Sequence, residues 1–146
     1  MGEEIHGTLY FKLQLHGREG GGLFTELSGG ASENAVIEQK VAMPDGHIGI
    51  RKIPGNLKFG DITLKRGLDD GLDLWKWRQL VIDGKYKEAR CDGTLMMLDH
   101  EMKPIATYAF TAGWPSKYTP AGMNAGQDQA ALEEITIAVE EYKRVP

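Results

Sequence analysis

The stretch KIPGNLKFGDITLKRGLDDGLDLWKW, from Lys52 to Trp77, decides the fold because it holds a turn, a strand and the start of a helix in one continuous piece. Pro54-Gly55 is a turn dipeptide, since proline fixes its own backbone angle and glycine tolerates the reversal that follows. From Asp61 to Lys65 apolar and polar residues alternate, with Ile62 and Leu64 on one side. This period of two predicts a strand with one buried face.

A helix is expected after this strand, from about Gly71 to Ile82. Either Asp69 or Asp70 can cap it by accepting hydrogen bonds from its first N–H groups, and Gly84 is placed to end it.

The expected helix carries two apolar stripes, which follow from the helical period. One consists of Leu74, Trp77 and Val81; the other consists of Leu72, Trp75 and Ile82. A helix that lies on its own sheet buries a single stripe. The second stripe is therefore a candidate contact with another subunit, and a helix sunk deep in the core of a monomer is the alternative.

The length and composition favour a single domain over residues 1–146. A chain of this size buries about 70% of its unfolded surface and needs no disulfide staple. The single cysteine, Cys91, cannot form a disulfide within the chain, which fits synthesis in a reducing compartment. No signal peptide and no membrane-spanning segment can be recognised, so synthesis in the cytoplasm is expected.

Charge is distributed unevenly along the chain, whose net charge is −4. Residues 51–90 carry ten basic and six acidic side chains, whereas residues 1–50 carry three and seven, and residues 128–146 carry two and five. A basic middle between acidic ends is compatible with complementary charge between copies of the chain. Charges scattered over a solvated surface are the alternative for most individual residues.

The remaining patterns indicate a β-rich fold, because 19 glycines separate short runs of alternating residues. Strands are expected over residues 8–16, 23–27, 34–43, 86–98, 105–112 and 134–140. Gly17 to Gly22 is expected to connect a hairpin, and Trp114-Pro115 to end a strand, because proline has no N–H for the ladder. Residues 43–59 are expected to form a long, partly extended loop, and residues 116–129 a second irregular stretch. A loop as long as 43–59 is usually functional.

No constellation of residues points to catalysis, to a cofactor or to a metal. The glycines Gly20 to Gly22 are not followed by GK[ST], so a hairpin is favoured over a phosphate loop. His6 and His16 lie ten residues apart in one extended run, about 33 Å, which is too far to share an ion. Cys91 is expected to be a small buried apolar residue rather than a nucleophile. The sequence therefore predicts a protein that is not an enzyme.

Four motifs, in this order, resemble the tail tube proteins of contractile-tailed phages and the inner tube proteins of phage-derived contractile injection systems. They are KIPGNLKFGDITLKRG, LWKW, GWPSKY at Gly113 to Tyr118, and LEEITIAVE at Leu132 to Glu140. FTELSGG at Phe24 to Gly30 also fits, and the resemblance covers nearly the whole chain. The chain departs from the family at Glu38-Gln39-Lys40, where a tyrosine–arginine pair is common.

The resemblance implies a mainly β fold of the barrel or sandwich type with one flanking α-helix, assembled as a hexameric ring. Such rings stack into a hollow tube that acts as the conduit for cargo or DNA. Partners implied by the family are further copies of the chain, a sheath and a baseplate. Whether the source is a phage, a tailocin or an injection system stays open. A monomeric β-barrel that binds a small apolar ligand, with Trp75, Trp77 and the methionines around a pocket, is the alternative.

Within this interpretation, the expected loop 43–59 is the candidate for contacts between stacked rings. It begins the basic middle of the chain and is punctuated by proline and glycine, so it can project from the body. The residues expected to act there are Arg51, Lys52, Pro54 and Lys58. A head-to-tail stack needs two different, complementary surfaces on each ring.

Overall fold

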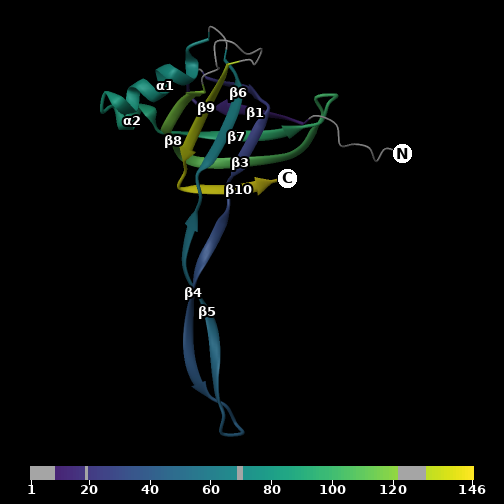
Figure 1. The fold of residues 1–146 in the computed structure, drawn as a ribbon, viewed down its shortest axis with the longest axis vertical. Coiled ribbons are helices and arrows are strands. Elements are labelled where there is room, and N and C mark those ends of the chain that lie inside the picture. Colours follow the sequence, from purple (N-terminus) through teal and green to yellow (C-terminus); the bar gives the residue numbers. More distant parts are fainter. Residues whose placement is uncertain (1–8, 19, 69–70, 122–130) are drawn as a thin grey trace.

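A computed structural model describes residues 9–18, 20–68, 71–121 and 131–146. It shows a β-rich body with helices on one side and a long two-stranded hairpin that projects from the body (Figure 1). The strands of the body are β1 (Tyr10–Leu15), β2 (Gly21–Phe24), β3 (Glu26–Gly29), β6 (Ile62–Gly67), β7 (Cys91–Leu98), β8 (Pro104–Ala121), β9 (Leu132–Ala138) and β10 (Glu141–Val145). The hairpin consists of β4 (Ser32–Ala42) and β5 (Ile48–Phe59), and the helices are α1 (Asp73–Ile82) and α2 (Tyr86–Ala89).

The body is an antiparallel sheet with the strand order β2-β1-β7-β8-β9-β6-β3, and β10 pairs with β8. Strand β8 is 18 residues long and belongs to both halves of this sheet. Its first part pairs with β7 and β10, and its second part pairs with β9. Among the described residues, no pairing joins β2 to β3, so the sheet is an open sandwich rather than a closed barrel.

The core lies between the two halves of the sheet and under α1. Apolar side chains from both halves and from the helix form one cluster, which includes Leu13, Phe24, Ile62, Leu64, Trp77, Leu95, Phe110, Ile135 and Ile137. The alternation predicted for Ile62 and Leu64 is confirmed, because both are fully buried. The same holds for Ile135 and Ile137 in β9.

Helix α1 buries the stripe that its period predicts, with Leu74, Trp77 and Val81 facing the core. The helix begins with Leu72 at its N-cap position, and the expected caps, at 69 and 70, lie outside the described residues. It ends at Ile82, and Gly84 follows its C-cap residue Asp83, at the place predicted for a helix stop. The φ of Gly84 is 80°, a left-handed conformation that suits glycine.

Several expectations for the body were wrong. A second, four-residue helix, α2, occupies the start of the expected strand 86–98, so the strand begins at Cys91 instead. Strand β8 continues through Trp114-Pro115 to Ala121, and a β-bulge between Pro115 and Lys117 accommodates the proline. The short strand β10 was not predicted, because five residues with three charges carry little periodic signal.

The expected loop 43–59 is also wrong in its larger part, because residues 48–59 form strand β5. The reversal is a short turn between β4 and β5, where the N–H of Gly46 donates to the carbonyl of Met43 over 2.9 Å. Pro54-Gly55 lies inside β5 at a register shift rather than at a turn. A β-carbon on Gly55 would approach the carbonyl oxygen of Ala35 to 2.9 Å, so close backbone packing accounts for this glycine.

Candidate functional site: the assembly surfaces

The β4–β5 hairpin is a two-stranded ribbon that carries apolar side chains into solvent. Within the described chain it pairs with no third strand. Val36 is 64% exposed and Ile48 73% exposed, and Ile37, Ile50 and Leu57 are also exposed. An isolated two-stranded hairpin is marginal in water, and large exposed apolar patches mark interaction sites. The hairpin is therefore a surface that needs a partner.

The four residues expected to act in ring stacking all lie on β5. Lys52 stands opposite Glu38 and Lys58 stands opposite Glu33 in the ladder, whereas Arg51 faces Gln39 and Pro54 faces Val36. The acidic side chains of β4 thus offset part of the positive charge of β5, so the hairpin is less basic than the sequence of β5 alone indicates. The hairpin combines alternating charge with exposed apolar groups rather than forming a purely basic surface.

The second stripe of α1 is exposed in the single subunit. Leu72, Trp75 and Ile82 are exposed on the helix, and Trp75 is 41% accessible. The indole of Trp75 packs against the ring of Tyr118 from β8, with ring centroids 5.4 Å apart and planes tilted by 58°. This contact fixes the indole on the surface without burying it.

An ionic network under α1 joins the helix to the sheet. The guanidinium of Arg66 donates from Nε to Glu133 over 2.7 Å, from one terminal nitrogen to Asp73 over 3.0 Å, and from the other to the carbonyl of Gly21 over 2.8 Å. Glu133 is 2% exposed and also accepts a 2.6 Å hydrogen bond from the hydroxyl of Tyr118. The network connects β2, β6, β8, β9 and α1 at one point.

The pKa values of the network follow from burial and pairing. Burial raises the pKa of Tyr118 to about 12, and the hydrogen bond to Glu133 adds to the shift. Burial lowers the pKa of Arg66, but hydrogen bonds to Glu133 and Asp73 outweigh this effect, so the net shift is upward. Tyr118 therefore stays neutral and Arg66 stays charged near neutral pH, and the arrangement is that of a structural clasp.

The open sheet leaves unpaired edges. Strands β2 and β3 end the path, so each has one edge that pairs with no other strand of the described residues. Natural proteins pair, cover or block such edges. Together with the hairpin and the helix face, these edges give the subunit several surfaces suited to contacts with other chains.

The described residues can be checked for a metal site, for a reactive cysteine and for the pocket of the alternative ligand-binding barrel. Among the described residues, no cluster of His, Cys, Asp and Glu could hold a metal ion. Burial raises the pKa of the Cys91 thiol, which disfavours a reactive thiolate. Trp77 is a fully buried part of the core and Trp75 lies on the surface, so the two do not share a pocket. No helix within the described ranges has the length and apolar character to cross a membrane.

The fold defines a structural subunit suited to assembly. Its open sandwich carries a layer of helices, and the sheet edges, the hairpin and one face of α1 are exposed in the single copy. The chain belongs to the family described as T4-like virus tail tube protein gp19, whose model matches residues 7–143. No curated protein matches the sequence significantly.

Several solved structures share this fold. The chain is similar to a protein in the sixfold-symmetrised baseplate of the anti-feeding prophage, with a TM-score of 0.74, 13% identity, and coverage of 97% of this chain and 94% of that one. A similar protein in the extended sheath–tube complex of the extracellular contractile injection system PVC has a TM-score of 0.69, 18% identity, and coverage of 92% and 88%. Hcp1 from Flavobacterium johnsoniae has a TM-score of 0.56, 12% identity, and coverage of 92% and 94%.

Proposed function

We propose that the chain is the structural subunit of the inner tube of a contractile tail or injection system, and that six copies close into a ring. The observation that carries the ring is the open sheet, whose end strands lack partners within the described chain. Pairing each edge with a neighbouring copy closes the sheet around an axis and leaves no edge exposed. The similarity to a protein of a sixfold-symmetrised baseplate supports the number six.

Rings of this kind stack into a hollow tube that conducts cargo or DNA. The whole chain acts as one tube domain and has no catalytic role. Similarity to proteins of a sheath–tube complex and of a baseplate supports a sheath and a baseplate as its partners. The subunit is made in the cytoplasm and becomes part of the tail or injection particle.

Ring formation is tested by sedimentation velocity and electron microscopy of the purified chain. Closed rings, or tubes built from them, are the expected products. Only monomers across the micromolar range, in the presence of isolated baseplates as templates for assembly, contradict the proposal.

The hairpin carries the contacts between stacked rings. Its apolar residues, exposed in the single subunit, become buried when two rings stack. Arg51, Lys52 and Lys58 pair with acidic side chains of the next ring and so fix the register between rings. Each exposed charge pair contributes about 0–1 kcal/mol, but a ring repeats it around the axis.

Replacement of Arg51, Lys52 and Lys58 by glutamate is expected to leave rings intact and to prevent stacking. The same charge change at Lys87, Lys103 and Lys143, which lie outside the hairpin, is the control and is expected to leave tubes intact. Tubes of the hairpin variant that are as long and as salt-resistant as those of the parent refute this role of the hairpin.

A further inference from the structure

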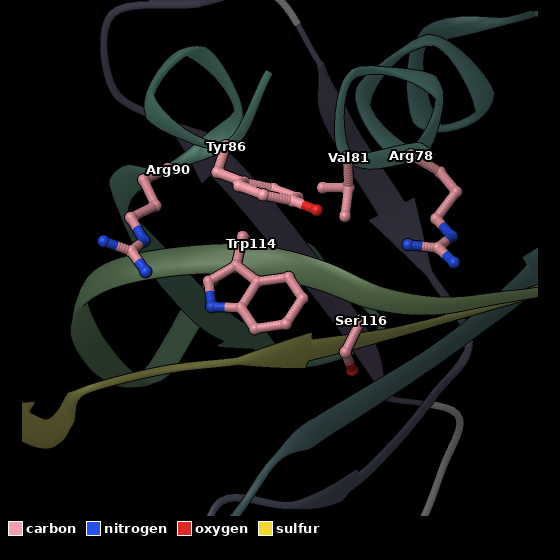
Figure 2. A pocket seen from close by; sticks show the side chains of 6 residues that line it. All are labelled: Arg78, Val81, Tyr86, Arg90, Trp114 and Ser116. Carbon is pink, nitrogen blue, oxygen red and sulfur yellow. The ribbon is translucent and has the colours of Figure 1, made fainter. Parts of the chain in front are cut away.

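A cleft lies between the helical layer and strand β8, away from the hairpin. Its volume is about 470 Å³. Its lining residues come from α1, from α2, from Arg90 directly after α2, and from β8. The lining residues are Arg78, Val81, Tyr86, Arg90, Trp114 and Ser116. Figure 2 shows the rings of Tyr86 and Trp114 and the side chain of Val81 in the middle of the cleft, with one arginine on either side.

The two arginines place separate positive charges at the ends of this apolar centre. Arg78 donates to the carbonyl of Pro115 over 3.2 Å, which holds its side chain along β8. Among the residues that the structure describes, neither guanidinium of Arg78 and Arg90 forms an ion pair with a carboxylate. Arginine presents a planar fork of donors that matches carboxylates well.

The surroundings strengthen the positive field. The segment 76–90 carries five basic and two acidic side chains, although the chain as a whole has a net charge of −4. One of the two acidic groups, Asp83, already accepts a hydrogen bond from the amide of Gln79 over 3.0 Å. A ligand for this cleft is therefore anionic at two points and apolar between them.

We propose that the cleft binds an acidic peptide segment of a partner protein other than this chain. Carboxylates of the segment pair with Arg78 and Arg90, and an apolar side chain between them packs on Trp114. A ligand with a single charge engages one arginine only, whereas an extended peptide spans both. A long nucleic acid is disfavoured because its many phosphates meet the net negative charge of the remaining surface.

This interaction goes beyond the proposed tube function, because the cleft lies outside the hairpin and the sheet edges to which ring closure and stacking are assigned. A partner held in this way is attached by local charge complementarity and by one apolar contact. Such contacts set specificity and association rate more than affinity. The interaction is accordingly expected to weaken as salt rises.

The test uses the full chain and a synthetic peptide, acetyl-Gly-Asp-Glu-Phe-Glu-Asp-Gly-amide. Binding is followed by the indole N–H signals in a proton–nitrogen NMR spectrum, where Trp114→Phe identifies one of the three tryptophan signals. The peptide with Asn and Gln in place of Asp and Glu is the neutral control. Sedimentation velocity, run on the same samples, reports ring formation separately.

The acidic peptide is expected to shift the Trp114 signal, and the neutral peptide to bind at least about threefold more weakly. Arg78→Gln and Arg90→Gln are each expected to weaken binding about threefold to fivefold, as for exposed charge pairs. Arg78→Lys, which retains the charge, recovers part of the loss. The matched variants Lys85→Gln and Lys87→Gln remove equal charge from outside the lining and are expected to change binding less than about twofold.

Equal binding of the neutral peptide overturns the proposal, and so does unchanged binding by both arginine variants. Tighter binding of an oligothymidylate of the same length overturns it in favour of a nucleic-acid site. Loss of rings in Arg90→Gln without any peptide overturns it in favour of a contact between copies. Arg90 is exposed, so this variant folds even where substitution of Arg78 disturbs β8.

Discussion

The two tryptophans of α1 offer a matched pair of substitutions, because they lie two residues apart on the same helix with opposite exposure. Trp77 is fully buried, and its Nε1–H donates to the carbonyl of Ala89 over 2.7 Å. Trp75 is 41% exposed and contacts Tyr118. Trp77→Ala is expected to reduce the stability of the subunit, and Trp75→Ala to reduce assembly.

The magnitudes follow from what each ring contacts. Removing a fully buried indole costs about 3–5 kcal/mol through lost burial and the remaining cavity. The carbonyl of Ala89, itself buried, then lacks its donor, which costs a further ~1 kcal/mol. Removing Trp75 costs about 1 kcal/mol, since an exposed aromatic contact contributes about that much. Against a typical domain stability of ~5–15 kcal/mol, only the first change is large.

The assay is urea unfolding of the dilute subunit, followed by circular dichroism, with sedimentation of a concentrated sample as the measure of rings. Trp77→Phe is the intermediate case, because it keeps an aromatic ring and loses the hydrogen bond. If Trp75→Ala unfolds the subunit while the surviving protein still assembles, the assignment of the two faces is reversed. If Trp77→Ala costs under about 1 kcal/mol, the cavity argument itself is refuted.

Further expectations concern the clasp and one close contact in the core. Glu133→Gln is expected to cost about 2–4 kcal/mol in urea unfolding, because the partly buried guanidinium of Arg66 loses its main carboxylate partner. A loss below ~0.5 kcal/mol contradicts this. In the folded protein the pKa of Tyr118 is raised from 10 to about 12. The neutral phenol therefore stabilises the fold fully below pH ~10, and this contribution is lost as the pH rises through about 12. Tyr118→Phe is therefore expected to flatten the alkaline loss of stability, and an unchanged slope counts against it. Gly93→Ala places a β-carbon 2.3 Å from the ring of Phe110 and is expected to lower the thermal midpoint of unfolding by several degrees, about 1–3 kcal/mol; a midpoint equal to that of the parent shows that the ring moves freely.

Much of the body could be predicted because its strands are half-buried and alternate cleanly. In β6 and β9 the buried positions coincide with the apolar ones, so a period of two is visible in the residues. The buried stripe of α1 was predictable for the same reason, at the helical period. The resemblance to tail tube proteins rested on these same segments.

The first arm of the hairpin was expected as a strand over residues 34–43, but its second arm, β5, could not be predicted from its pattern, because both faces of the hairpin are exposed in a single copy. Apolar and polar residues therefore do not alternate along β5. The dipeptide Pro54-Gly55 is typical of a turn, but it lies at a register shift inside the strand. The ionic clasp was equally hidden, since Arg66 and Glu133 lie far apart in sequence and only the β6–β9 register brings them together. The cleft could not be predicted from Arg78 and Arg90 either, because it forms only where the fold places Trp114 of β8 between them.

The continuity of strand β8 affects how the subunit unfolds. Because one continuous strand pairs with β7 and β10 at one end and with β9 at the other, neither half of the sheet can come apart while the other stays closed. The body is therefore expected to unfold as one cooperative unit, and its core amides to share one free energy of opening in hydrogen exchange. The β4–β5 ribbon is attached only through its base and has no such constraint. Its amides are expected to exchange early in a free subunit, and the proposed stacking of rings on the hairpin predicts slower exchange in tubes.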